Sequence, residues 1–167
     1  VFPAISIADA LKGLLPGAEI LFVGALGRLE MEKVPEAGYK IIGLPVAGFQ
    51  RKFILKNLSF PVKLLRSMML SSRIIKDFKP EIAIGVGGYA SGPILRAASN
   101  KKIPVVIQEQ NSYAGMTNRM LAPRAAKIFV AYKGMEKYFP ADRLILTGNP
   151  VRPEIIKIDA GREEALR

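Results

Sequence analysis

Short apolar runs alternate with longer amphipathic segments along most of this chain, and this alternation limits its fold more than any other feature. The runs are rich in valine, isoleucine and leucine, as strands buried on both faces are. They cover residues 20–23, 40–44, 82–85, 105–107, 127–130 and 144–146, and helical patterns cover 4–14, 29–36, 58–78, 93–100, 116–121 and 135–139. Strands that alternate with helices predict an α/β protein with one doubly wound parallel sheet. Ligands of such sheets bind beyond the carboxyl ends of the strands.

A glycine-rich turn joins the third apolar run to the next helical pattern. Its sequence is Gly85-Val86-Gly87-Gly88-Tyr89-Ala90-Ser91-Gly92-Pro93. Residues without a Cβ let the backbone approach a ligand closely, and the N-terminus of the following helix favours an anion. The turn therefore predicts a phosphate cradle. The structural alternative is a tight strand-to-helix connection that needs glycine for its backbone angles.

Two further polar loops follow apolar runs. Residues 108–115 place Glu109 beside amide side chains, which suits hydrogen bonds to sugar hydroxyls or the ordering of a loop. Residues 148–152 end in Arg152, whose planar guanidinium suits a phosphate or a carboxylate. Structural roles stay open for both, Glu109 as a cap of the next helix and Arg152 as a bridge between domains.

The composition excludes several kinds of chemistry. A chain of 167 residues, 50% of them apolar, can form one domain with a sizeable core. It contains no cysteine, which excludes disulfides and thiolate metal sites, and no histidine, the commonest general base at neutral pH. No carboxylates are spaced like a metal site, and no apolar run approaches the roughly 18 to 20 residues that span a bilayer. We therefore expect no metal, no cofactor and at most a peripheral membrane contact.

The segment 58–78 has two apolar faces, whereas a surface helix needs only one. One stripe and the basic residues near it comprise Leu58, Val62, Leu65, Met69, Lys63, Arg66 and Arg73. The formal net charge of the chain is +11, which favours anionic partners. A basic helix with an outward apolar face predicts insertion at an anionic membrane interface. Alternatively, both faces pack inside the fold and the charges form a solvated surface.

Several segments together resemble the MurG family of bacterial glycosyltransferases. They are Phe2-Pro3-Ala4, Glu36-Ala37-Gly38-Tyr39, Gly87-Gly88-Tyr89-Ala90-Ser91-Gly92-Pro93, Glu109-Gln110-Asn111, Gly115 with Thr117-Asn118, and Gly148-Asn149-Pro150-Val151-Arg152. They occur in the family's order. The resemblance implies a GT-B architecture, in which two Rossmann-like domains flank a cleft, and it identifies this chain as the N-terminal, acceptor-side domain.

The resemblance also implies an activity. Members of the family move N-acetylglucosamine, with inversion, from UDP-GlcNAc to undecaprenyl-diphosphate-MurNAc-pentapeptide (lipid I), which gives lipid II for peptidoglycan synthesis, cell shape and cell division. The implied partners are UDP-GlcNAc, lipid I and an anionic membrane surface, with no cofactor and no nucleic acid. The implied location is peripheral, on the cytoplasmic face of the bacterial plasma membrane.

Site residues follow from the resemblance motif by motif. Asn111 and Arg152 are expected to bind the donor, and Gly87, Gly88, Tyr89 and Ser91 are expected near the acceptor diphosphate, with Glu109, Gln110, Thr117 and Asn118 in support. The stripe on segment 58–78 matches the family's membrane patch. The family's proposed base is a histidine in a glycine-rich loop that would precede Val1, so no catalytic residue is expected within this chain. Gln108 stands where many members have histidine, and it is given no catalytic role.

The same resemblance predicts the domain organisation. Residues 1–152 are expected to form the N-terminal domain without its first strand and glycine loop. Residues 153–167 are expected to link to, and begin a helix toward, a C-terminal donor-binding domain. On this view the chain alone is inactive as a transferase.

Three other functions remain as alternatives. The stretch Gly85 to Ala90 satisfies a dinucleotide fingerprint, with Glu109 about 20 residues further on, as in nicotinamide-dependent oxidoreductases. The high positive charge would also suit a nucleic-acid-binding module, although aromatic and basic residues do not alternate as in a stacking platform. Another UDP-sugar transferase or epimerase would keep the fold and change the acceptor.

Overall fold

A computed structural model describes residues 1–46 and 60–151 of the chain. The helices are α1 (Phe2–Leu14), α2 (Glu30–Glu36), α4 (Phe60–Phe78), α5 (Ser91–Asn100) and α6 (Met116–Leu121). The strands are β1 (Leu21–Ala25), β2 (Lys40–Leu44), β3 (Ala83–Gly85), β4 (Val105–Glu109), β5 (Lys127–Val130) and β6 (Leu144–Leu146), and short 3-10 turns cover Ala122–Arg124, Met135–Lys137 and Ala141–Arg143. The predicted α/β alternation is confirmed.

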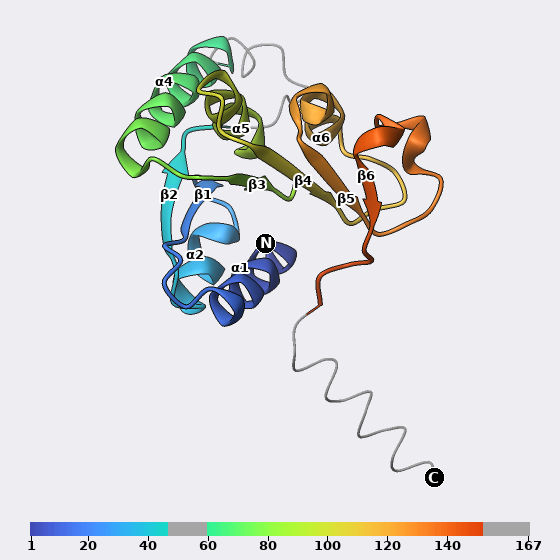
Figure 1. Cartoon of the computed structure of the whole chain (residues 1–167). Helices are drawn as coiled ribbons and strands as arrows, with labels where there is room; N and C mark the ends of the chain where they lie inside the picture. Colours follow the sequence, from blue (N-terminus) through green and yellow to red (C-terminus); the bar gives the residue numbers. More distant parts are fainter. Residues whose placement is uncertain (47–59, 152–167) are drawn as a thin grey trace.

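Within residues 1–46 and 60–151, the strands pair in parallel but form two hydrogen-bonded sheets and not the single sheet that the sequence pattern predicts. β1 pairs with β2, and the second sheet has the order β3-β4-β5-β6. Helix α5 contacts both β1 and β3, so helix packing joins the two sheets where strand pairing does not. Figure 1 shows α4, α5 and α6 on one side of the strands and α1 and α2 on the other, as in a doubly wound fold.

The prediction of an α-helix over residues 135–139 is wrong, because only a 3-10 turn forms there, over Met135–Lys137. Gly134 before it has a left-handed φ of 75°. Pro140 follows, and the residue before a proline is disfavoured in the helical region. Too few residues remain between these two for an α-helix.

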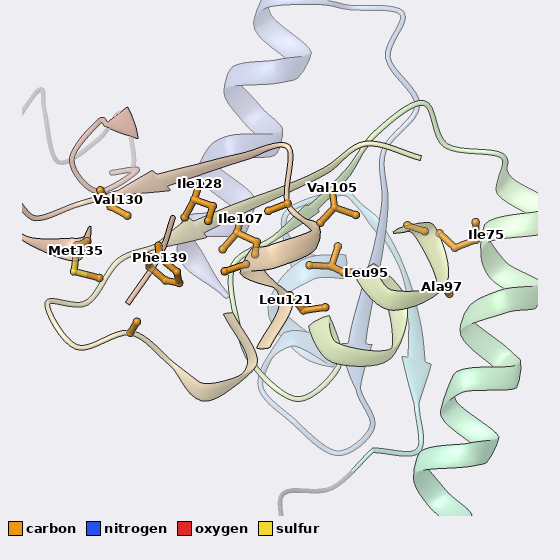
Figure 2. Close-up of a cluster of buried hydrophobic side chains, with 14 residues drawn as sticks. Ile75, Leu95, Ala97, Val105, Ile107, Leu121, Ile128, Val130, Met135 and Phe139 are labelled. Carbon is orange, nitrogen blue, oxygen red and sulfur yellow. The ribbon is translucent and has the colours of Figure 1, made fainter. Parts of the chain in front are cut away.

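The main core lies on the side of the four-stranded sheet that α5 and α6 cover. Ile107 and Ile128 are fully buried there, and Leu95 of α5 and Leu121 of α6 pack against them (Figure 2). Burying each such side chain contributes about 1.5 to 3 kcal/mol. Gly85 belongs to this packing, because a Cβ at that position would collide with the Leu95 side chain. This glycine therefore allows the close approach of α5 to the end of β3.

Helix α4 buries a different set of residues from the second apolar face expected from its sequence. That face comprises Leu64, Ser71, Ile75 and Phe78 in the sequence. Ser71 and Ile75 are buried as predicted and Phe78 is partly buried, whereas Leu64 is exposed. Ser67 and Ile74 are buried in addition. Helix α4 contacts α5, and the small buried serine side chains fit a close approach of this helix to the rest of the fold.

The motif Glu36-Ala37-Gly38-Tyr39 has a structural role in this fold. The Tyr39 hydroxyl donates a hydrogen bond to Asp9 Oδ1 at 2.7 Å, which ties the start of β2 to α1. Burial and, secondarily, this bond to Asp9 raise the pKa of Tyr39 to about 12. Gly38 has a φ of 82°, a backbone conformation that favours glycine at the turn after α2.

Candidate functional site

The candidate site lies where β1, β3 and β4 end, at one edge of the fold. The turn after β3 contains the glycine-rich segment, and the loop after β4 contains Gln110 and Asn111. Parallel strands place their carboxyl ends on the same side, so these loops are neighbours. A hydrogen bond from Gln110 Nε2 to the carbonyl oxygen of Val86, at 3.5 Å, joins them directly.

The glycine-rich turn has the backbone of an anion-binding loop. Gly87 and Gly88 have φ angles of 86° and 85°, in the left-handed region that favours glycine. The Ser91 hydroxyl donates to the carbonyl oxygen of Gly87 at 2.6 Å, so this side chain holds the turn together. No side chain caps the N-terminus of α5, which leaves backbone N–H groups of its first turn for a ligand.

Glu109 is the centre of the second loop. Its side chain is only 1% exposed, and its carboxylate accepts four hydrogen bonds. Oε1 accepts from the backbone N–H and from Nδ2 of Asn111, at 3.0 and 3.1 Å. Oε2 accepts from the backbone N–H of Gly115 at 2.9 Å and from Asn118 Nδ2 at 3.0 Å. Gly115 is the N-cap residue of α6, whose first turn receives no side-chain cap, so the loop-ordering role expected for Glu109 is the one that is present.

Asn118 supports the second loop and lies close to the glycine-rich turn. This buried side chain on α6 also donates to the carbonyl oxygen of Gln108 at 3.3 Å. A Cβ on Gly87 would lie 3.5 Å from Asn118 Nδ2, so the glycine-rich turn passes close to this amide. Thr117 lies beside it, with its methyl group 3.7 Å from where a Cβ on Gly92 would be. The supporting residues expected from the sequence are therefore brought together.

Arg28 is a site residue that the sequence pattern does not reveal. It lies in the turn between β1 and α2, and its guanidinium carbon is 5.5 Å from the centre of the Tyr89 ring. Tyr89 is half exposed and belongs to the glycine-rich turn. An arginine stacked on an aromatic ring keeps its N–H donors available to an anion. The only signal in the sequence is that Arg28, like the other site residues, follows a strand.

The outward stripe of α4 is exposed in the structure. Val62, Leu65 and Met69 have 69%, 63% and 60% of their surface exposed. The basic residues Lys63, Arg66 and Arg73 are exposed as well, and Arg73 Nε lies 3.6 Å from Asp77 Oδ2. Within the described part of the chain, no helix has the length and hydropathy to cross a bilayer.

Two expected contributors lie outside the described residues. They are Leu58 at the start of the stripe and Arg152 at the end of the third loop. The predicted linker, residues 153–167, also lies outside the described residues. The part of the third loop that is described ends at Val151. In residues 1–46 and 60–151, no three acidic, histidine or cysteine side chains lie close enough together to hold a metal ion.

The geometry argues against the dinucleotide alternative. In that class an acidic residue at this distance from the fingerprint accepts hydrogen bonds from the ribose hydroxyls. Here both oxygens of Glu109 are occupied by N–H donors of the protein, and the side chain is buried. A ribose therefore finds no free carboxylate at this position.

Comparison with known proteins agrees with the geometry. The family model for the glycosyltransferase family 28 N-terminal domain matches residues 1–130. Curated proteins of Phocaeicola vulgatus and Bacteroides fragilis are 61% and 58% identical over 100% of this chain and 44% of their own length. Both are named UDP-N-acetylglucosamine--N-acetylmuramyl-(pentapeptide) pyrophosphoryl-undecaprenol N-acetylglucosamine transferase.

A solved structure shows the same relationship. The crystal structure of Acinetobacter baumannii MurG superposes with a TM-score of 0.73 at 27% identity, covering 92% of this chain and 42% of that one. The chain thus spans less than half the length of the relatives that it matches. Because the family model covers most of its residues, this chain belongs to glycosyltransferase family 28 and carries that family's N-terminal domain.

Proposed function

We propose that the full-length protein containing this chain transfers N-acetylglucosamine from UDP-GlcNAc to lipid I and so forms lipid II for peptidoglycan synthesis. The names of relatives that are 58% and 61% identical along the whole chain support this function. The structural observation that carries it is the hydrogen bond from Gln110 that joins the glycine-rich turn to the Glu109 loop, close to the buried Asn118. These two loops place a candidate anion site beside a candidate nucleotide-sugar site.

Each group in these loops has a distinct part in the proposed reaction. The C4 hydroxyl of the muramyl sugar attacks the anomeric carbon of the donor, its proton passes to a base outside this chain, and UDP leaves. The first turn of α5 and the Arg28 guanidinium face the acceptor diphosphate, because dipoles and cations fixed in place stabilise phosphate charge without reorganisation. Asn111, together with Arg152 beyond the described residues, holds the donor.

A direct assay tests this function. Purified full-length protein, incubated with UDP-GlcNAc and lipid I, is expected to release UDP and to form lipid II, both followed by mass spectrometry. UDP-GalNAc, the C4 epimer of the donor, serves as the control for sugar specificity. Turnover of UDP-GlcNAc by water alone, or with an unrelated acceptor and not with lipid I, would assign a different reaction to the family fold.

We further propose that α4 docks on an anionic membrane surface, where lipid I resides. Three exposed apolar side chains, Val62, Leu65 and Met69, follow helical spacing and so share one face. Basic side chains flank them, and Asp77 is the acidic residue on this helix. An apolar stripe with a basic border is the composition of an interfacial helix. We propose the cytoplasmic face of the plasma membrane as the location of this docking.

Replacing both Leu65 and Met69 by serine is expected to weaken binding to vesicles that contain phosphatidylglycerol by roughly tenfold or more. Each substitution removes most of the apolar surface that the exposed side chain offers to the lipid. The melting temperature should change little, because both side chains are already exposed. The matched control replaces Leu14 and Leu15, which are also exposed but lie at the end of α1. A loss of melting temperature with vesicle binding intact would instead place this face inside the full-length protein.

A further inference from the structure

We propose that Glu109 is a positioning residue, which sets the orientation of the Asn111 amide so that Asn111 offers its Oδ1 atom to the donor as a hydrogen-bond acceptor. This inference rests on the donor-binding role of Asn111 in the proposed function. Glu109 determines the orientation of the Asn111 amide, and this orientation in turn determines which chemical class of ligand group Asn111 recognises.

The orientation follows from what a carboxylate can do. An ionised carboxylate only accepts hydrogen bonds, so an asparagine amide can turn only its nitrogen toward it. Oε1 of Glu109 receives both the backbone N–H and Nδ2 of Asn111, at 3.0 and 3.1 Å. These two bonds to one oxygen hold the side chain and the backbone of Asn111 together. The Oδ1 atom is consequently directed away from Glu109, on an exposed residue.

The other carboxylate oxygen fixes Glu109 itself. Oε2 accepts from Gly115 at 2.9 Å and from the buried Asn118 at 3.0 Å. The residues between Asn111 and Gly115 are therefore closed into a loop around one carboxylate. A buried charge is stable only when such donors surround it, and removal of the charge leaves several N–H groups without an acceptor. Glu109 cannot turn away without breaking bonds at both ends of the loop.

The exposed Oδ1 restricts the ligand group. As an acceptor it binds a hydroxyl or an N–H group and repels a phosphate oxygen, which at neutral pH also accepts. A nucleotide sugar offers hydroxyls on its hexose and its ribose, and its diphosphate offers none. The Oδ1 atom of Asn111 is thus assigned to a hydroxyl or an N–H group of the donor and not to its diphosphate, which offers neither at neutral pH.

A set of variants in the full-length protein tests this inference through the KM for UDP-GlcNAc. Glu109→Gln alone is expected to raise KM about tenfold, because a glutamine at 109 can no longer accept at both ends of the loop. In an Asn111→Ala background, the same change should alter KM by less than about twofold, since no amide remains to be oriented. Glu81→Gln, an exposed residue before β3, is the matched control and should leave KM unchanged.

An aspartate at 111 gives a sharper result. Asn111→Asp places two carboxylates in contact and should raise KM by more than Asn111→Ala does. Adding Glu109→Gln to this variant restores a donor–acceptor pair, because the glutamine amide N–H donates to the carboxylate at position 111. Glu109→Gln, which raises KM in the native protein, should therefore lower KM in the Asn111→Asp background. A residue that only stabilises the loop would harm both backgrounds alike. Melting temperatures are measured for every variant.

The outcomes separate this inference from the proposed function. If Asn111→Ala leaves KM for UDP-GlcNAc unchanged, the donor role of Asn111 is wrong. If Asn111→Ala raises KM but Glu109→Gln costs the same in the native, alanine and aspartate backgrounds, the donor role stands and the positioning role is overturned. Should Glu109→Gln not fold, an Asn111→Asp variant with native KM would overturn it by itself.

Discussion

Replacing Ile107 by alanine is expected to lower the free energy of unfolding by about 2 to 5 kcal/mol. Ile107 has no exposed surface and lies in β4, which has a strand on each side. Leu95 of α5 and Ile128 of β5 belong to the same cluster (Figure 2), and neighbours held in separate elements cannot collapse fully into the space that alanine leaves. The midpoint of urea denaturation of the full-length protein, followed by circular dichroism, measures the loss.

A matched control comes from the same sheet. Ile145 in β6 is 37% exposed, so Ile145→Ala removes less buried surface and should cost clearly less. Equal losses at the two positions would show that Ile145 is covered in the full-length protein. A loss below about 1 kcal/mol for Ile107→Ala would contradict the central place of this residue in the core.

Reversing the three basic residues beside the α4 stripe, Lys63, Arg66 and Arg73, to glutamate is expected to reduce binding to anionic vesicles by at least about a hundredfold. Each basic residue near such a surface contributes about 1 kcal/mol, and reversal replaces attraction by repulsion. Arg73 also forms an exposed ion pair with Asp77. Loss of this pair has little effect on the expected change in vesicle binding, since such pairs contribute at most about 1 kcal/mol. Vesicle cosedimentation at low and high salt measures the effect, which should fade as salt rises.

Net charge alone is the competing explanation, and a second triple variant separates the two. Lys12, Lys40 and Lys127 are exposed and lie on α1, β2 and β5. Reversing them changes the net charge by the same amount without touching α4. If both triple variants lose vesicle binding equally, the α4 surface has no special role, and the positive field of the whole protein accounts for the attraction.

Local sequence predicts the secondary structure of this chain well where the pattern is long or strongly apolar. The runs at β2, β5 and β6 have the predicted bounds, because buried parallel strands need continuous apolar residues. The segment 135–139 fails because five residues between Gly134 and Pro140 carry no reliable period. The division into two sheets also escapes the pattern, because strand pairing depends on contacts distant in sequence.

The candidate site divides in the same way. The glycine-rich turn and the group Glu109-Gln110-Asn111 are visible in the sequence, because left-handed backbone angles demand glycine and because strand ends carry ligand-binding loops. The contact of Arg28 with Tyr89 is not visible, since it joins turns from strands in different sheets. Whether Glu109 faces a ligand or the protein is likewise undecided by residue type.

The sequence by itself determined the class of fold, the order of the loops and the resemblance to a transferase family, because these depend on periodicity and on short motifs. Only the tertiary structure decided how the polar groups are used. It buried Glu109 beneath its own loop, surrounded the carboxylate with four N–H donors and left Asn111 exposed beside it. The physical reason is that a hydrogen bond depends on the distance and direction between two groups, and these are set by packing between segments far apart in the chain.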